Sequence, residues 1–343
     1  MVKRRPTLAE LADNLGISAN TASRALTGRD GVSQRTRELV RTEAKRIGYL
    51  SRRIDDDPND RSKSIALTIP SPMHAFSAEL FAAIEAGARA ADRSLDVYVT
   101  EENSARERDI VDHIMRSDVA GVIAIPVQHD DNPWPTLVDA DVPVVMVSRE
   151  VDALDCDFVG VDSEAGQYAA TRHLISQGCR SLVILDEDLE ISTVEQRRHG
   201  FDRALSETPD AVAHAVSVPS RRFEAGRGSW RAEEAYRACV ELIASGHSFD
   251  AIALGDDDFA LGALRALDEA GIRTPEDVCV TGYGDHPYAA WASPALTSVK
   301  LPSRIIGELA VSRLLQRLAG DTGPTMRRQI APELVTRASS IRL

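Results

Sequence analysis

Small and polar residues recur at helical spacing close to the N-terminus, in residues 7–28. Ala12 is a small residue where two short helices would cross, and Gly16 with the apolar Ile17 would form the turn between them. Hydroxyl, amide and guanidinium side chains follow, and such groups hydrogen-bond phosphates and base edges in the DNA major groove. The spacing predicts a DNA-binding helix-turn-helix; an ordinary helical hairpin is the alternative.

The other chemistry-bearing residues indicate neither an enzyme nor a metal protein. We find no Gly-x-Gly-x-x-Gly after an expected strand, no phosphate-loop lysine and no Gly-x-Ser-x-Gly motif. The carboxylates of residues 256–258 could suggest a metal site, but acidic residues favour a helix N-terminus, which explains them more simply. The eight His are dispersed. Four cysteines form no Cys-x-x-Cys pair, so we expect reduced, mostly buried thiols, no cofactor and no metal: Cys156, Cys179, Cys239 and Cys279.

Charge is distributed unevenly along the 343 residues. Residues 1–53 contain 12 Lys/Arg and 5 Asp/Glu, a net of +7, and the remainder holds 28 and 48, a net of −20. A basic head on an acidic body indicates a polyanion partner for the head; a solvated charged surface is the alternative. The basic N-terminus has no apolar segment behind it, and no run approaches about 18 apolar residues. We therefore expect a cytoplasmic protein without a signal peptide or membrane span.

Three short helices are expected in the head, residues 1–49. The first runs from Leu8 to about Leu15, with Thr7 as its N-cap and Glu10 at the capping-box position. Ser18 caps a second helix that ends near Leu26, before Thr27-Gly28. Ser33 caps a third, whose inner face is expected to comprise Leu39, Val40, Ala44 and Ile47.

Short apolar runs alternate with helical patterns from residue 64 onward, after a polar linker at residues 50–63. The alternation predicts an α/β body of parallel sheets covered by helices on both faces, with ligands at the carboxyl ends of the strands. The expected strands are Ile65–Ile69, Leu95–Val99, Gly121–Ile125, Val142–Val147, Phe158–Val161, Leu182–Leu185, Ala251–Leu254 and Val278–Gly282. The expected helices include Glu79–Ala91, Ala165–Gln177, Arg231–Ser245 and Phe259–Ala270.

A set of motifs over nearly the whole chain resembles the lactose-repressor (LacI) family of transcription regulators. In the head these motifs are Ser18-x-x-Thr21-x-Ser23-Arg24-x-Leu26, Val32-Ser33-x-x-Thr36-Arg37 and Gly48-Tyr49. In the body they are Asp162-x-x-x-Gly166, His173-Leu174-Ile175-x-x-Gly178, Arg197-x-x-Gly200-Phe201, Asp257-x-x-Ala260-Leu261-Gly262-Ala263, Pro275-Glu-Asp-Val278, Pro294-x-Leu296-Thr297-Ser298-Val299 and Leu334-Val335-x-Arg337.

The resemblance implies a periplasmic-binding-protein-like body of two lobes with three crossovers. Lobe 1 is expected at about residues 64–160 and 290–320, and lobe 2 at about 161–289 and 321–343. It also implies a repressor that binds a palindromic operator as a homodimer, because two-fold pairing lets two heads read two half-sites. No heptad tail follows the closing motif, so we expect no coiled-coil tetramer. A transport-type sugar-binding protein without a regulatory role is the alternative, against which the basic helical head argues.

In the head, the resemblance assigns DNA contacts residue by residue. Ala19, Asn20 and Arg24 match positions that read base edges; Asn pairs naturally with adenine and Arg with guanine. Three residues match family positions that bind phosphates: Thr7, Thr21 and Ser23. Local helix capping is the alternative for Thr21 and Ser23. The full set of expected DNA-binding residues is Thr7, Ser18, Ala19, Asn20, Thr21, Ser23, Arg24 and Thr27.

The linker departs from the family pattern. Family members have a Pro-Asn and an Ala-x-x-Leu there, which fold on DNA into a hinge helix whose Leu wedges into the minor groove. Here Ser51 and Arg52 occupy the Pro and Asn positions, Asp55 the Ala position and Pro58 the Leu position. Proline inside a helix costs about 3 kcal/mol, and the three Asp of residues 55–57 would repel phosphate. We predict no wedging hinge helix.

In the body, the resemblance implies a cleft for a small effector, a sugar or a nucleoside. Carboxylates and Arg would pair with hydroxyls and an aromatic face would pack on a ring. Phe76 and Trp230 could instead be core residues, Asp162 a helix cap and Arg197 a surface charge. Gly284 stands where the family often has a ligand-binding Asp, and Asp256 is expected to compensate. The expected effector-binding residues are Ser71, Phe76, Ser77, Ser148, Arg149, Asp162, Thr193, Arg197, Trp230 and Asp256.

Overall fold

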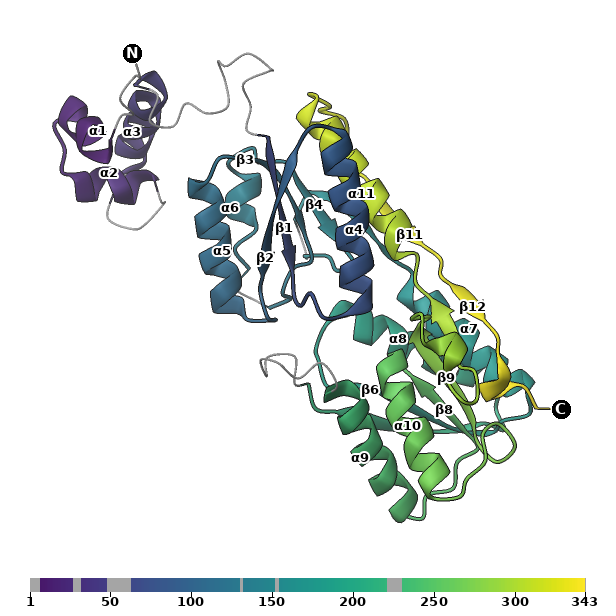
Figure 1. Ribbon diagram of the computed structural model, residues 1–343. Helices are drawn as coiled ribbons and strands as arrows, with labels where there is room; N and C mark the ends of the chain where they lie inside the picture. The colour runs from purple at the N-terminus through teal and green to yellow at the C-terminus, as the bar shows by residue number, and fades with distance from the viewer. Residues whose placement is uncertain are drawn as a thin grey trace. The chain divides into compact units, whose positions relative to one another are not determined.

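A computed structural model describes residues 7–26, 32–47, 63–129, 132–151, 154–220 and 230–342. The chain divides into two compact units, Met1–Ser62 and Lys63–Leu343 (Figure 1). Within the described residues, no helix is both long enough and apolar enough to span a bilayer.

The first unit contains the three helices expected from the sequence: α1 (Leu8–Leu15), α2 (Ala19–Leu26) and α3 (Gln34–Arg46). The predicted capping box at α1 is confirmed. Glu10 N–H donates to Thr7 Oγ1 at 3.2 Å, and Thr7 N–H donates to Glu10 Oε2 at 2.8 Å. Gly16 ends α1 with φ +65°, a left-handed conformation that a residue without a Cβ adopts readily. These caps set the angle at which α2 follows α1.

The core of this unit is small. Leu11, Ala25, Val40 and Ala44 are fully buried at its centre. Leu39 was expected on the same face, but its side chain is 53% exposed. The expectation was wrong because Val40 and Ala44, four residues apart, define the inward stripe of α3, and Leu39 lies about 100° away from Val40 around the helix.

The second unit holds two six-stranded sheets, one in each lobe. The lobe 1 sheet has the order β11-β5-β4-β3-β1-β2, and all its pairs are parallel. Its strands are β1 (Ser64–Ile69), β2 (Ser94–Val99), β3 (Val119–Ala124), β4 (Val144–Val147), β5 (Asp157–Val161) and β11 (Arg327–Ile330).

Helices cover both faces of the lobe 1 sheet (Figure 1). Along β1, Ile65 and Leu67 pack toward α4 (Ala75–Ala90) and α11 (Ser303–Leu318). Ala66 faces the opposite side, toward α5 (Ser104–Arg116) and α6 (Pro135–Val138). Because both faces are buried, the strand is an uninterrupted apolar run.

The lobe 2 sheet repeats this design in the order β12-β10-β9-β8-β6-β7. Only the β10–β12 pair is antiparallel among its described pairs. Its strands are β6 (Ser181–Glu187), β7 (Val212–Val218), β8 (Ala251–Leu254), β9 (Cys279–Gly284), β10 (Thr297–Lys300) and β12 (Glu333–Val335). The covering helices are α7 (Ser163–Ser176) and α8 (Ser192–Ser206) on one face and α9 (Trp230–Ala244) and α10 (Asp257–Glu269) on the other.

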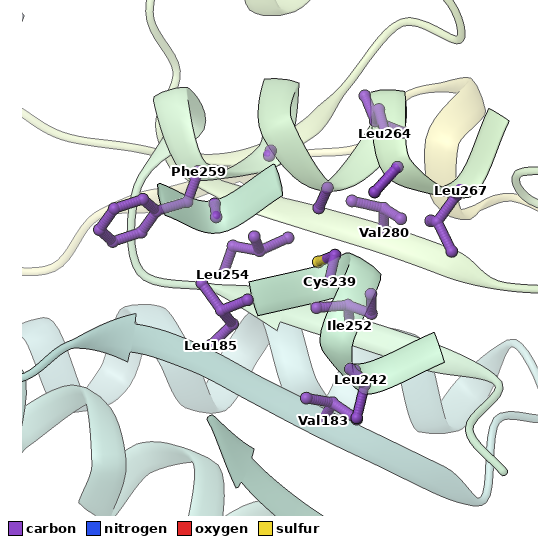
Figure 2. Packing of buried hydrophobic residues seen from close by; sticks show 14 of the residues in the cluster. Val183, Leu185, Cys239, Leu242, Ile252, Leu254, Phe259, Leu264, Leu267 and Val280 are labelled. Atoms are coloured by element: carbon purple, nitrogen blue, oxygen red, sulfur yellow. The ribbon is translucent and has the colours of Figure 1, made fainter. Parts of the chain in front are cut away.

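Figure 2 shows the core between the sheet of lobe 2 and helices α9 and α10. Ile252 and Leu254 from β8 meet Cys239 of α9 and Phe259 of α10. All four cysteines of the chain are free and buried, as expected. Together with the flanking helices of lobe 1, this arrangement confirms the predicted α/β fold.

The positions of two crossovers correct the expected lobe boundaries. Strand β10 pairs with β9, so residues 290–300 lie in lobe 2 rather than lobe 1. Strand β11 pairs with β5, so residues 321–330 lie in lobe 1 rather than lobe 2. These strands have four residues each, and β11 (Arg-Arg-Gln-Ile) has almost no apolar side chain to mark it. The lobe to which β11 belongs is determined by backbone pairing at the sheet edge, and the periodicity of the sequence does not reveal this pairing.

Candidate functional site

A cavity of about 90 Å³ lies between the two lobes, at the carboxyl ends of the strands of both sheets. This is the position that parallel sheets offer to ligands. Most residues expected to bind an effector line it. They are Ser71, Phe76, Ser77, Ser148, Arg149, Thr193, Arg197 and Asp256.

Arg197 and Asp186 form a bidentate ion pair in the wall contributed by lobe 2. Arg197 Nε and Nη2 donate to the two oxygens of Asp186 at 2.7 and 2.9 Å. Burial alone would lower the pKa of Arg197, but the Asp186 carboxylate outweighs it and raises that pKa. The guanidinium also lies over the Tyr283 ring, 5.3 Å from its centroid. Arg197 is therefore a buried, oriented donor and not the surface charge that was the alternative.

A second bidentate pair lies on the lobe 1 side. Arg149 Nη1 and Nη2 donate to the carboxylate of Glu102 at 2.7 and 2.6 Å, and both side chains are only 5% exposed. Arg149 Nη1 also donates to the backbone oxygen of Pro126 at 3.3 Å. Both arginines of the cavity wall thus have their charge compensated by a carboxylate within the protein.

Aromatic rings line the cavity, though Trp230 is not among them. Phe76, Phe259 and Tyr283 are at the cavity wall. Trp230 was expected there, but it is 4% exposed in the core of lobe 2, with its ring edge-on to Phe259 at 6.2 Å. The helical stripe of α9 that packs on the sheet includes Trp230, so burial against apolar neighbours decides its position.

Asp162 is also absent from the cavity wall. Its Oδ1 accepts the Ala165 N–H at 2.8 Å and so caps α7, which was the alternative for this residue. An N-cap side chain satisfies backbone donors that the helix itself leaves unpaired. Asp162 therefore acts as a helix cap and was wrongly expected to line the cavity.

The two lobes are linked in the cavity lining by a polar contact between His74 and Asp256. His74 is the N-cap of α4 in lobe 1, and Asp256 is the N-cap of α10 in lobe 2. His74 Nε2 donates to Asp256 Oδ2 at 2.8 Å. Burial lowers the pKa of His74; burial opposes ionisation of Asp256, yet the hydrogen bond from His74 leaves the pKa of Asp256 lowered. A neutral imidazole therefore donates to an ionised carboxylate across the cleft.

Several cavity residues carried no sequence motif. Asp186 and Glu187 end β6, and Gly255 follows β8, so all three sit at carboxyl ends of strands. Strand-end position was a usable signal for these residues. His74 carried no such signal in the sequence, because its partner Asp256 lies in the other lobe.

Most candidate DNA-binding residues of the head lie in α2 or directly before it. Ser18 caps the helix, accepting the Thr21 N–H at 3.0 Å, and the Ser18 and Thr21 hydroxyls are 2.8 Å apart. Local capping, the alternative for Thr21, is therefore present. Ala19 and Arg24 are exposed, while Ser23 is partly exposed. Thr7 is exposed at the start of α1, where it makes the capping box described above.

Two predictions concern residues outside the described part of the chain. Thr27 and the whole 50–62 part of the linker are not described, and the side chain of Asn20 is not described either.

Comparison with characterised proteins extends over nearly the full chain. Residues 171–340 match the family described as periplasmic binding protein-like domain. The transcriptional regulator CelR of Thermobifida fusca is 28% identical over 98% of this chain and 99% of its own length. The transcriptional repressor PurR of Salmonella paratyphi A is 27% identical over 97% of this chain and 96% of its own length.

Solved structures agree with this. The CelR–cellobiose complex superimposes with a TM-score of 0.71 at 26% identity, covering 98% of this chain and all of that one. A lac repressor dimer, bound to operator and the anti-inducer ONPF, superimposes with a TM-score of 0.72 over 99% of this chain and all of that one. At 23% identity the second likeness shows the fold alone.

Proposed function

The chain belongs to the LacI family of DNA-binding transcription regulators, and we propose that it is a repressor that binds a palindromic operator as a homodimer and responds to a small neutral sugar. Members of this family are not enzymes, so we propose that the cavity binds an effector. Binding to operator DNA requires that the protein is located in the cytoplasm.

The compensated charge of the cavity carries the proposal of a neutral ligand. Arg197 is paired with Asp186, and Arg149 with Glu102, each through two hydrogen bonds. An anionic ligand would have to compete with these carboxylates for the guanidinium groups. Hydroxyl groups need no such displacement, because they donate to carboxylates and accept from Arg and Ser.

Aromatic side chains at the cavity wall support a sugar in the same cavity. Phe76, Phe259 and Tyr283 border the cavity beside its polar wall. This combination of a mostly apolar lining with a few fixed polar groups is typical of small-molecule sites. A nucleoside satisfies the same description, and the binding experiment below separates the two classes.

The head supports the operator proposal. In its helix-turn-helix, Ala19 at the start of α2 and Arg24 in its last turn are exposed to solvent. One such helix reads one half-site, so two copies related by a two-fold axis read a palindrome. The relative crystallised on its operator is described as a dimer.

A binding screen on the full chain tests the effector. Cellobiose, monosaccharides, nucleosides and phosphorylated sugars are added separately, and the midpoint of thermal unfolding is measured. A specific ligand raises it by mass action. The proposal expects a neutral sugar to raise the midpoint and to change operator affinity in gel retardation. A response to phosphorylated sugars alone would overturn the neutral-ligand proposal, and a nucleoside response would reassign the class.

The same preparation tests the alternative of a transport-type binding protein. Such a protein would bind sugar but would not retard any DNA fragment from a library of random palindromes. Selection of a palindromic site by the full chain supports a regulator.

A further inference from the structure

His286 is a buried imidazole that follows β9 in lobe 2. It is 5% exposed, and its Nε2 has no hydrogen-bond partner among the described residues. A buried nitrogen without a partner is costly, so it points to a group that would bind there. Imidazole nitrogen is a common ligand of transition metals.

Two further potential ligand atoms lie close to the His286 imidazole. His74 Nε2 and Asp256 Oδ2 are 2.8 Å apart, and ligand atoms from His74, Asp256 and His286 all lie within 4.8 Å of one another. The two imidazole rings are nearly perpendicular, with centroids 5.5 Å apart. In a tetrahedral zinc site with bonds of about 2.0–2.1 Å, ligand atoms are ~3.4 Å apart. The observed spacing brackets this value, so metal binding would need only small side-chain movements and a shift of the His74 proton from Nε2 to Nδ1, which frees Nε2 as a ligand.

We propose that His74, Asp256 and His286 form a binding site for a divalent transition-metal ion of the zinc class. Two nitrogens and one carboxylate oxygen suit such an ion, whereas calcium and magnesium prefer oxygen ligands alone. The three residues leave a fourth position for water or for a ligand hydroxyl in the adjoining cavity, which His74 and Asp256 also line.

The surroundings hold these ligands in place. The backbone N–H of His286 donates to Asp257 Oδ2 at 2.7 Å, and Asp257 Oδ1 accepts the Ser298 hydroxyl at 2.6 Å. In its present position the His286 ring occupies the space beside Gly284, where a Cβ would lie 2.7 Å from its Cε1, so a larger residue at 284 would displace the ring. The residue that replaces the family's usual aspartate thus makes room for the imidazole. Such supporting contacts orient metal ligands and tune affinity.

Charge near the site also permits a cation. The nearest guanidinium is that of Arg231, whose Nε lies 3.7 Å from Asp256 Oδ2. Asp256 is the carboxylate that it approaches, and Asp257 and Asp258 follow directly in the chain. Arg231 also lies over the Trp230 ring, 4.6 Å from its centroid, which holds it beside the Asp256 carboxylate as a neighbour of the proposed ligand set.

The proposed ion would join the lobes, since His74 belongs to lobe 1 and the other two ligands to lobe 2. It would favour the arrangement in which the cavity is closed. Metal binding itself does not rest on the proposed sugar effector. The sequence predicted no metal, because His74 and His286 are separated by most of the body.

The test uses the full chain, stripped of metal with a chelator, and Zn²⁺ alone by isothermal titration calorimetry. We expect one ion per chain and a higher thermal unfolding midpoint. Co²⁺ alone should give the visible absorption of a tetrahedral site. His286→Ala and His74→Ala should each weaken binding by at least about tenfold and abolish the Co²⁺ spectrum.

A matched control distinguishes this site from adventitious binding by surface histidines. His214 and His247 are exposed, with ring centroids 4.7 Å apart. His247→Ala should leave Zn²⁺ affinity unchanged. Absence of binding in the parent chain, or an equal loss in His247→Ala, would overturn the proposal. If His286→Ala unfolds, the more exposed His74→Ala decides. Sugar binding is measured separately, so failure of one proposal does not conceal the other.

Discussion

The carboxylate of Asp186 lies directly against the backbone of Gly255. A Cβ at position 255 would stand 2.1 Å from Asp186 Oδ1, a distance that real Cβ atoms do not reach. Glycine at the end of β8 is therefore what lets Asp186 face Arg197 across the cavity wall. The ion pair and the strand end that accommodates it form one unit.

Gly255→Ala tests this unit. The added methyl should displace Asp186, weaken effector binding and lower the free energy of unfolding by about 1–3 kcal/mol through overpacking. Chemical denaturation and ligand titration measure the two effects. The double variant Gly255→Ala/Asp186→Ala removes the clash. Its loss of unfolding free energy should therefore be smaller than the sum of the losses in the two single variants. Additive losses would contradict the proposed contact.

Asp186→Asn tests the charge compensation of Arg197. The neutral amide leaves the guanidinium unpaired, so the free energy of unfolding should fall by about 3 kcal/mol or somewhat less. Ligand preference should move toward phosphorylated sugars, measured as their shift of the unfolding midpoint. Asp188→Asn, an exposed neighbour outside the cavity, should change neither property. An unaltered preference in Asp186→Asn would count against the neutral-ligand proposal.

Glu107 predicts a pH dependence of stability. It is fully buried, and burial raises its pKa to about 7 although its carboxylate accepts the Val127 N–H at 2.7 Å. Between about pH 4.5 and 7 the folded chain retains a proton that the unfolded chain releases, so this residue's contribution to stability falls as pH rises through that window.

Glu107→Gln keeps the acceptor for Val127 and removes the titration. Relative to the parent chain, the variant should gain stability as pH rises from about 4.5 to 7, by up to about 3 kcal/mol, and stay constant above. Urea unfolding at pH 5 and pH 8 measures the difference. Glu308→Gln, on the exposed face of α11, serves as the control and should show no such trend. Parallel pH profiles for Glu107→Gln and the parent chain would refute the assignment.

Arg24 is expected to read a base edge. Arg24→Ala should cost about 1–3 kcal/mol of discrimination and relax preference at one operator position. Competition binding against single-base operator variants measures this. Arg35→Ala, an exposed arginine on α3, should at most weaken binding to all variants alike. Unchanged operator preference in Arg24→Ala would remove this residue from the reading set.

The linker sequence predicts an operator without a sharp kink. Pro58 and the three Asp of residues 55–57 disfavour a helix in the minor groove. Energy transfer between dyes at the ends of an operator duplex should therefore change little when the full chain binds. A large increase in transfer efficiency, or a helical 51–59 segment in a complex, would show that a wedging hinge forms after all.

Local chemistry made the head and the strands predictable. Thr7, Glu10 and Gly16 determine the limits of α1 through contacts a few residues apart, so the sequence alone was sufficient. Buried parallel strands such as β1 and β8 were visible as continuous apolar runs. Strand β7 was missed because most of its side chains are exposed at a sheet edge.

The sequence by itself determined the head, the two-sheet body and the family, since each rests on short-range spacing or on motifs in a fixed order. Only the tertiary structure decided which polar residues face the cavity. Asp162 and Trp230 belong to the expected set, yet Asp162 caps a helix and Trp230 packs in the core. Asp186 and His74 carry no motif, yet both line the cavity. The reason is physical: a helix cap or an apolar core uses a side chain locally, whereas pairing across a cleft depends on where distant strands end.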